Sequence, residues 1–379
     1  MEFIDLKRQY AAYKEEIDQA VSRVIHSGRF VLGEEVGLLE EELAAFTGAQ
    51  FAIGVSSGTD GLLLALMSMG VGPGMEVVTT PFTFIATAEA IALLGARPLF
   101  VDIDPLSFNI DATKLRELLE KRRQKGRLPA GVIPVSLYGL CADMDEINAI
   151  SDEFGLFVVE DACQSLGATY KGRSSCSLSL LAATSFFPSK PLGCFGDGGM
   201  VFTSDADLRD KIVAMREHGQ TKRYQHDVLG INGRLDALQA AVLRVKLKYF
   251  PQEIRSRREV AGFYAKLLAS LSEHARPPRV PDGYTSVYAQ YTIRIGGGIR
   301  DEVARFMNDG KIPTAIHYPK PLHLQRAFSY LGYGQGDFPE AEKACQEVLS
   351  LPMHAFLDRS EQEEVVDVLE KALKNFKKI

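Results

Sequence analysis

The chain alternates, from about residue 50 onward, between short apolar runs and longer helical patterns, and few folds accommodate this alternation. The expected strands are rich in β-branched or aromatic residues and span 51–55, 76–80, 98–103, 131–138, 157–161, 183–187 and 199–204. Helical patterns such as 61–70 and 86–95 lie between them. Because continuous apolar strands separated by helices form parallel sheets covered on both faces, the sequence predicts an α/β fold with a mostly parallel central sheet.

A second, smaller unit is expected in the last third of the chain. Beyond about residue 205, long charged helical runs follow one another with no strand between them. A strand is then predicted over 287–295, a helix over 301–310 and a closing amphipathic helix over 361–378. We therefore expect a large domain at 1–250 and a small C-terminal α/β domain at 251–379, with the N-terminal segment packing on the small domain.

The charge balance argues against nucleic acid as a partner. The chain has 43 Lys and Arg against 49 Asp and Glu, a formal net charge of -6, and positive charge gathers only in short runs such as 120–127. The longest apolar stretches are broken by Gly, Pro or charge well before the ~18 residues that a membrane span needs. The N-terminus lacks the basic and apolar regions of a signal peptide, so a soluble cytoplasmic protein is predicted.

The five cysteines are an odd number without CxxC spacing and without a neighbouring histidine pair. This pattern favours neither a disulfide framework nor a zinc site. We expect small apolar side chains in a reducing compartment, and no metal.

Polar residues directly after the strands are the candidates for chemistry, because ligands of doubly wound sheets bind beyond the carboxyl ends of the strands. SSGTDG at 56–61 is a turn of small residues followed by a helix. It is either a phosphate cradle made of free N–H groups or a helix-capping turn. Asp161 closes an apolar strand, either as a buried carboxylate with a partner or as a helix cap.

Lys190, in SFFPSK, follows another apolar strand together with Ser185 and precedes a glycine-rich turn. It is either a surface residue of a loop or a partly desolvated amine tuned for Schiff-base chemistry. A phosphate-binding helix start, a carboxylate for a pyridinium nitrogen and a loop lysine, in this order on a parallel sheet, are what a pyridoxal phosphate enzyme requires. Phe84 lies just past the second strand, where an aromatic side chain is expected to cover the ring.

Motifs spread in order over about 270 residues resemble those of the DegT/DnrJ/EryC1/StrS sugar aminotransferases. They read SSGTDGL, TTPFTFIATAEAI, FVDID, VVEDACQSLGATYKG, SFFPSK with the glycines that follow, HGQ and HYPKPLHLQ. The resemblance implies a fold type I transaminase of the EC 2.6.1 type that works as a homodimer with shared active sites.

The same resemblance implies roles for individual residues. Lys190 holds pyridoxal 5'-phosphate covalently and Asp161 pairs with the pyridine nitrogen. The rest of the cofactor site is Gln164 at the ring hydroxyl, Phe84 stacked on the ring, Gly58, Thr59 and Ser185 at the phosphate, and Asn232 at the phosphate of the neighbouring subunit. Glutamate converts the cofactor to pyridoxamine phosphate and leaves as 2-oxoglutarate. The amine then adds to a ketone on a nucleotide-linked sugar, with Lys190 as acid and base.

Local choices of sequence are most similar to the branch that aminates UDP-2-acetamido-2-deoxy-3-oxo-glucuronic acid at C3 for the O-antigen of lipopolysaccharide. They include VSLYG, with Ser136 where many relatives have histidine, INGRLD and SVYAQYT. Arg234 is either the bidentate partner of the uronic acid carboxylate or the partner of an acid at the dimer contact. His317 and Tyr318 are expected to bind the sugar or glutamate.

Other functions remain open at this point. The substrate alternative is a 4-keto-6-deoxy or another 3-keto nucleotide hexose. A non-catalytic regulator that binds pyridoxal phosphate should lack at least one cofactor residue, and none is missing. The related dehydratases carry histidine in place of the lysine, so Lys190 excludes them. A nicotinamide oxidoreductase needs a glycine fingerprint after the first strand, whereas the glycines at 70–78 precede a strand.

Overall fold

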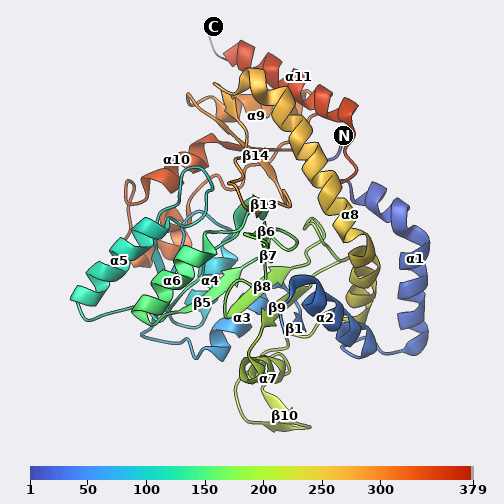
Figure 1. Ribbon diagram of the computed structural model, residues 1–379, viewed down its shortest axis with the longest axis vertical. Helices are drawn as coiled ribbons and strands as arrows, with labels where there is room; N and C mark the ends of the chain where they lie inside the picture. The colour runs from blue at the N-terminus through green and yellow to red at the C-terminus, as the bar shows by residue number, and fades with distance from the viewer. Residues whose placement is uncertain (377–379) are drawn as a thin grey trace.

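A mixed sheet of seven strands forms the centre of the computed structural model, which describes residues 1–376 (Figure 1). The strand order is β1-β9-β8-β5-β4-β2-β3. The strands are β1 (Phe51–Val55), β2 (Glu76–Thr79), β3 (Arg97–Phe100), β4 (Gly131–Val132), β5 (Phe157–Asp161), β8 (Leu181–Ser185) and β9 (Gly199–Thr203). The pairs from β3 through β2, β4 and β5 to β8 are parallel, whereas β9 runs antiparallel to both of its neighbours. The predicted mostly parallel sheet is confirmed.

Helices cover both faces of this sheet, which explains why its strands are apolar on both sides. Val158 and Val159, neighbours on β5, belong to two different hydrophobic clusters because successive side chains point to opposite faces. One cluster packs under α2 (Glu34–Thr47), α5 (Ala112–Gln124), α6 (Met144–Phe154) and α8 (Ala237–Leu267). The other packs under α3 (Gly58–Ser68), α4 (Ala86–Leu93) and α7 (Ala206–Met215).

The strand expected over 131–138 is shorter than the sequence pattern indicated, because regular pairing ends at Val132. Pro134 has no N–H group to donate to a ladder. Its carbonyl still accepts a hydrogen bond from the Asp161 amide at 2.9 Å, and Val135 forms an isolated parallel bridge to Asp161. The chain therefore continues beside β5 as an irregular extension up to the carboxyl end of the sheet.

A hairpin interrupts the region that we expected to contain helices alone. Strands β10 (Gln220–Lys222) and β11 (Gln225–His226) pair between α7 and α8 and project from the body of the protein (Figure 1). Their sequence has no apolar alternation, and the side chains of both strands are mostly exposed. The expectation of no strand in this region was wrong because hydrophobic periodicity does not detect a polar, two-stranded hairpin.

The C-terminal part has its own hydrophobic cluster around a three-stranded sheet. Its elements are β12 (Ala275–Arg276), β14 (Tyr291–Ile295), β15 (Val348–Leu351), α9 (Arg300–Asp309), α10 (Pro339–Glu347) and α11 (Arg359–Phe376). A further small sheet joins β6 (Thr169–Tyr170), β7 (Arg173–Ser174) and β13 (Tyr284–Thr285). Helix α8 extends from the central sheet into this part, and the expected domain boundary at 250–251 lies inside it.

The N-terminal helix α1 (Leu6–Ser27) packs along α8 (Figure 1). Arg8 forms hydrogen bonds of 2.8 and 2.6 Å with the carboxylate of Glu361, and the carbonyl of Phe3 accepts a 3.1 Å bond from the Met353 amide. These contacts connect the first residues of the chain to the start of α11 and to the segment before it.

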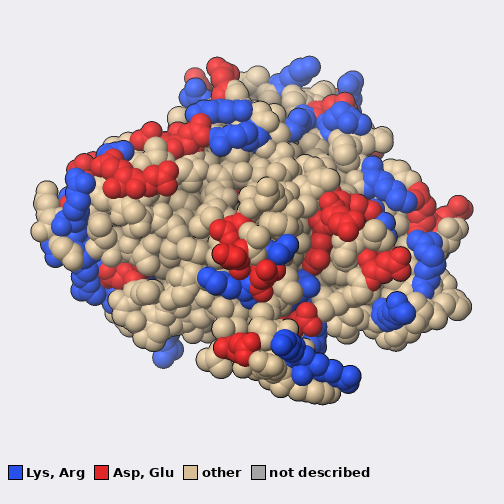
Figure 2. Space-filling model, turned by 60° about the horizontal axis from the view of Figure 1, so that its bottom comes forward, with Lys and Arg blue, Asp and Glu red and all other residues tan. Residues whose placement is uncertain are grey.

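Within residues 1–376 no helix is long and apolar enough to cross a membrane. No cluster of three metal-binding side chains occurs in the described part of the chain, and all five cysteines are free thiols. Figure 2 shows acidic and basic side chains interspersed over one face of the molecule, without an extended basic surface there.

Candidate active site

A cavity of about 480 Å³ lies beyond the carboxyl ends of β5 and β8. Its lining includes nine of the eleven residues that the sequence singled out: Gly58, Thr59, Phe84, Asp161, Gln164, Ser185, Lys190, His317 and Tyr318. The two others, Asn232 and Arg234, do not line it. The topological position is the one expected for ligands of doubly wound sheets.

The N-terminus of α3 forms one wall of the cavity. Ser57 caps this helix by accepting a 3.0 Å hydrogen bond from the Asp60 amide. Gly58 comes so close to its neighbours that an added Cβ would lie 2.7 Å from Cβ of Ser185 and 2.9 Å from Sγ of Cys163. A side chain would fill the space in front of the helix, so glycine keeps the first N–H groups accessible to an anion.

Asp161 lies at the end of β5 with only 5% of its surface exposed. Its Oδ2 accepts a 2.7 Å hydrogen bond from the Thr87 hydroxyl, and its Oδ1 accepts a 3.2 Å bond from the Cys163 amide. Both donors are neutral. The carboxylate is thus oriented at the cavity without a cationic partner among the described residues, and it can pair with a positively charged nitrogen of a ligand.

Gln164 is held on both sides of its amide group. Its Oε1 accepts a 2.8 Å bond from the Tyr138 amide, and its Nε2 donates to the Tyr318 hydroxyl at 3.3 Å. Burial raises the pKa of Tyr318, so this phenol stays neutral at physiological pH. The Tyr138 hydroxyl donates to the carbonyl of His317 and connects the loop after β4 to the His317–Tyr318 segment.

Lys190 lies on the loop between β8 and β9 and lines the cavity without any ion pair to the described residues. Its backbone amide donates to the Phe187 carbonyl at 2.8 Å. Gly193 closes the same loop so tightly that a Cβ there would lie 2.5 Å from the Pro188 carbonyl oxygen. The glycines after SFFPSK therefore allow a compact turn that fixes the backbone of the lysine.

Two side chains of helix α8 form hydrogen bonds with the backbone of this loop. The buried Lys246 amine donates a 2.6 Å bond to the Gly193 carbonyl, and Gln239 accepts a 2.8 Å bond from the Phe195 amide. Burial lowers the pKa of Lys246 to about 8. Two side chains of one rigid helix thus position the segment that carries Lys190.

His317 and Phe84 complete the cavity on the side of the small C-terminal sheet. The Nδ1 of His317 lies 3.1 Å from the Ser350 hydroxyl, and burial together with the charge of Lys190 lowers the pKa of its imidazole. His317 is therefore neutral at pH 7. Phe84 is 55% exposed and lies at the rim, with its ring centroid 6.3 Å from that of Tyr318.

Asn232 and Arg234 lie on the segment between the projecting hairpin and α8. Asn232 is exposed and forms an isolated bridge with Glu217, and Arg234 bridges to Val55 of β1. The Nε of Arg234 is buried and has no hydrogen-bond partner among the residues that the structure describes. The structure does not bring these two residues to the cavity of their own chain.

Several residues of the site were not predicted. Thr87 sits in the quoted motif TTPFTFIATAEAI, one helical turn after Phe84, and this spacing was the available signal. Gln290, in SVYAQYT, lines the cavity with a buried Oε1 that has no hydrogen-bond partner. No pattern in the sequence indicated that Tyr138 would bind Gln164, because the two residues belong to different loops.

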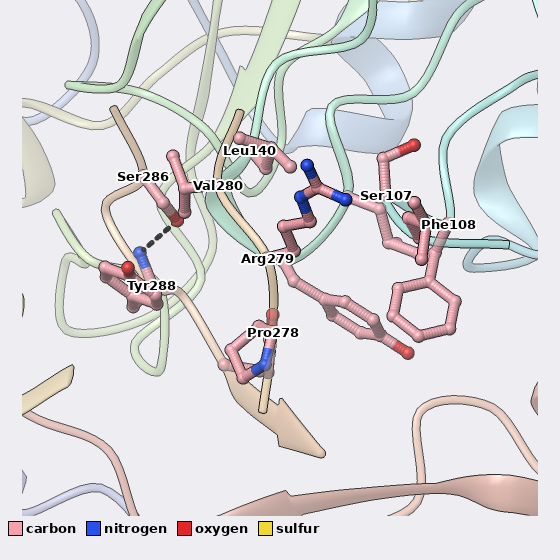
Figure 3. Close-up of a pocket in the computed structure, with 12 residues that line it drawn as sticks. Ser107, Phe108, Leu140, Pro278, Arg279, Val280, Ser286 and Tyr288 are labelled. Carbon is pink, nitrogen blue, oxygen red and sulfur yellow. Dashed lines mark hydrogen bonds between the residues drawn. The ribbon is translucent and has the colours of Figure 1, made fainter. Parts of the chain in front are cut away.

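A second, small cavity adjoins the first at Gln290, which lines both. Figure 3 shows Arg279 beside Ser107 in this second cavity, and Ser286 accepting a 2.9 Å bond from the Tyr288 amide. Its volume is about 20 Å³, which admits no more than water.

An amine, a carboxylate and an open helix N-terminus around one cavity at the end of a parallel sheet define the class of the protein: an enzyme that uses pyridoxal 5'-phosphate. The arrangement fits this cofactor, because Gly58 leaves room at the helix start and, within residues 1–376, Asp161 has no cationic partner and Lys190 no anionic one. The chain belongs to the DegT/DnrJ/EryC1/StrS aminotransferase family, whose model matches residues 11–370.

Individual relatives of known sequence or structure align with nearly the whole length of this chain. The chain is 48% identical to the UDP-2-acetamido-2-deoxy-3-oxo-D-glucuronate aminotransferase of Pseudomonas aeruginosa, over 94% of this chain and 96% of the relative. It is 44% identical to the pleiotropic regulatory protein of Geobacillus stearothermophilus, over 98% of each chain. The solved structure of NtdA from Bacillus subtilis, with bound pyridoxamine phosphate, superposes with a TM-score of 0.90 at 28% identity, covering 99% of this chain and 85% of that one. The protein is a sugar aminotransferase with a pyridoxal phosphate cofactor.

Proposed function

We propose that the protein transfers an amino group from glutamate to C3 of UDP-2-acetamido-2-deoxy-3-oxo-glucuronic acid, for the O-antigen of lipopolysaccharide. The observation that carries the proposal is the meeting of the Lys190 amine and the Asp161 carboxylate in one cavity. The choice of substrate is supported by the Pseudomonas aeruginosa relative at 48% identity, whose name states this ketone. A 3-keto or 4-keto-6-deoxy nucleotide hexose is the competing substrate.

The residues of the cavity would bind different parts of the cofactor. Lys190 would hold the cofactor covalently, Asp161 would bind its ring nitrogen, and Gln164 its ring hydroxyl. The phosphate would lie at the start of α3, against Gly58, Thr59 and Ser185, and Phe84 would cover the ring. When bound, pyridoxal phosphate supplies an electron sink that acidifies the carbon attached to the amino nitrogen.

Proton transfer belongs to Lys190 in this proposal. Its Nζ takes the proton from the α carbon of glutamate in the first half reaction and gives a proton to C3 of the sugar in the second. The loop held by Lys246 and Gln239 keeps the amine near both carbons. His317 and Tyr318 are neutral and offer hydrogen bonds to the sugar or to glutamate.

We further propose that the active protein is a cytoplasmic homodimer and that Asn232 and Arg234 act in the cavity of the partner. Apolar exposure supports the dimer: Tyr224 and Leu229, at the hairpin, are 80% and 88% exposed, and Phe187 at the rim of the cavity is 51% exposed. Projecting apolar side chains of this kind are typical of a protein interface. Arg234 would supply the cation for the sugar carboxylate.

The experiment is a panel of keto nucleotide sugars assayed with glutamate as the amino donor. The proposal expects amination of the 3-oxo-glucuronic acid with a higher kcat/KM than any neutral hexose. Faster amination of a neutral 4-keto hexose would replace the proposed substrate, and no amination of any ketone would favour a regulatory role.

The carboxylate assignment has its own variants. Arg234→Ala should lower kcat/KM for the uronic acid by about 10- to 100-fold, the value of a charge-assisted hydrogen bond, and leave a neutral hexose nearly unaffected. Arg234→Lys keeps the charge and should lose less. Equal losses for both sugars would exclude the carboxylate role.

A further inference from the structure

Glu160, the residue directly before Asp161 on β5, is a fully buried carboxyl group outside the catalytic cavity. None of its surface is exposed, and no lysine, arginine or histidine in the described part of the chain pairs with it. Consecutive strand residues point to opposite faces of a sheet, so Glu160 lies behind the strand while Asp161 faces the cavity. A buried acid without a cation requires an explanation.

Three donors from two loops bind this carboxyl group. Its Oε1 accepts hydrogen bonds from the hydroxyls of Ser136 at 3.1 Å and Ser175 at 2.8 Å. Its Oε2 accepts a 3.0 Å bond from the Cys176 amide. Ser175 in turn lies 2.7 Å from the Ser165 hydroxyl. The network includes, through its hydroxyl, the serine of VSLYG that the sequence singled out, Ser136.

The same network reaches the backbone of Asp161. The Ser136 amide donates to the Asp161 carbonyl at 3.0 Å, and the Asp161 amide donates to the Pro134 carbonyl at 2.9 Å. Ser136 therefore binds Glu160 with its side chain and Asp161 with its main chain. One serine thus links the Glu160 carboxyl group to the backbone of the strand end that carries Asp161.

Opposing effects act on the pKa of the Glu160 carboxyl group. Burial raises the pKa of Glu160 to about 7, the three donors oppose this rise, and Asp161 adds to it. The other titratable groups nearby are the thiols of Cys141 and Cys176, whose pKa values burial raises, so both stay neutral. Asp161 is thus the charged group with which Glu160 interacts.

We propose that Glu160 is a positioning residue for the cofactor site: it holds the end of β5 through Ser136 and, once it ionises as the pH rises, places a second negative charge behind Asp161. This charge stabilises the positive charge of the cofactor that Asp161 binds, without any contact between Glu160 and the cofactor. The inference rests on the proposed pairing of Asp161 with the ring nitrogen.

Glu160→Gln is the direct test, because the amide keeps the shape and removes the charge. The serine hydroxyls can rotate to accept from its NH2 group, and its oxygen can accept from the Cys176 amide. In the holoenzyme, the midpoint of the pH titration of the cofactor absorbance should move to lower pH. A shift on the order of 0.5 unit is expected, below the 1 to 3 units of a charge in direct contact. An unchanged midpoint overturns the proposal.

Glu76→Gln is the matched control. Glu76 is also buried in the same sheet, but it begins β2 at the opposite end and pairs with Arg122. This variant should lose stability and leave the absorbance midpoint in place. If it moves the midpoint as far as Glu160→Gln does, the effect reflects general loosening of the sheet, and the proposal fails.

The protein without cofactor supplies an independent readout. Burial raises the pKa of folded Glu160 to about 7, so the folded protein keeps this proton up to about pH 7, whereas the unfolded chain releases it near the ordinary glutamate pKa of 4.5. The stability that this proton contributes is therefore present at low pH and is lost as the pH rises through the folded pKa. Relative to the parent protein, Glu160→Gln should gain stability in urea unfolding as the pH rises from 4.5 to about 7, and parallel stability curves would contradict the proposal.

The two proposals fail in distinguishable ways. Loss of the cofactor band in Asp161→Asn with no shift in Glu160→Gln retains the role of Asp161 and removes that of Glu160. If Glu160→Gln does not fold, Ser175→Ala serves instead, since it deletes one donor and should move the midpoint in the same direction by a smaller amount.

Discussion

The cofactor half and the substrate half of this site are built in different ways. Lys190, Asp161 and Gln164 lie in one cavity of one chain, and each is held by hydrogen bonds or by a tight turn. Asn232 and Arg234, proposed to contact the partner's ligands, lie outside this cavity beside an exposed hairpin.

This difference separates chemistry from specificity. The groups that every transamination needs are fixed by the strand ends of the central sheet, where the backbone is buried on both faces. The groups that would select a sugar lie on the segment between a projecting hairpin and α8, outside the regular strands of the sheet, and such connecting segments vary more readily than strands. The following predictions test this separation from the largest expected effect to the smallest.

Lys190→Ala should lower kcat for transamination by at least about 10²- to 10⁴-fold, because the proposed acid and base is removed. The covalent attachment of the cofactor should vanish from the mass spectrum of the reduced protein. Lys248→Ala, which removes an exposed lysine paired with Glu16 on α1, is the control and should retain full activity. Sugar amination by the Lys190 variant would refute the assignment.

Asp161→Asn should lower kcat by about 10²- to 10³-fold, the usual cost of a lost electrostatic group in a preorganised site. The amide oxygen can still accept from Thr87, so the fold should persist. Thr87→Val keeps the carboxylate and removes one donor, and a smaller loss is expected. If Thr87→Val lowers kcat as much as Asp161→Asn does, the orientation of the carboxylate rather than its charge limits the reaction.

Leu229→Asp should weaken self-association at least about tenfold, since a charge would enter a desolvated contact. Sedimentation at several concentrations measures this, and circular dichroism should show an unchanged fold because the side chain is 88% exposed. Leu128→Asp, at an exposed leucine after α5, is the control. A dimer unaffected by Leu229→Asp would place the interface elsewhere.

Gly58→Ala should weaken cofactor binding and cost about 1–3 kcal/mol of stability, because the new methyl group would overlap Ser185 and Cys163. Gly37→Ala, in the middle of α2, has no atom within 4 Å of the new Cβ and should be neutral or slightly stabilising. Equilibrium dialysis against pyridoxal phosphate and thermal unfolding give the two readouts. If Gly58→Ala and Gly37→Ala bind pyridoxal phosphate with equal affinity, Gly58 does not contribute to binding of the phosphate.

The central sheet was predictable from the sequence because its strands are buried on both faces and read as continuous apolar runs. The limits of β1 and β5 agree with the predicted 51–55 and 157–161. The strand predicted at 131–138 ends early, at Val132, because Pro134 has no N–H group to donate and the apolar pattern does not reveal this. The hairpin of β10 and β11 was not predicted, because its short polar strands have no hydrophobic periodicity.

The positions of the site residues were predictable where a residue directly follows a strand of the central sheet. They were unpredictable where two separate loops contact each other. Asp161, Lys190 and the turn at Gly58 share the carboxyl edge that any parallel sheet presents. The bond from the Tyr138 amide to Gln164 and the unpaired Gln290 depend on how separate loops pack together. The environment of Glu160 was also unpredictable, because its three donors come from two loops that are distant in the sequence and its burial depends on how they pack.

The shared site is tested most directly by subunit complementation. Lys190→Ala and Arg234→Glu chains, each with its own affinity tag, are co-expressed, and the heterodimer is isolated through both tags. If Arg234 acts in the partner's cavity, one of the two sites in this heterodimer is intact, and its activity on the uronic acid should be about half that of the parent dimer. Activity no higher than that of either variant alone would show that both residues serve the same chain's site and would contradict the account.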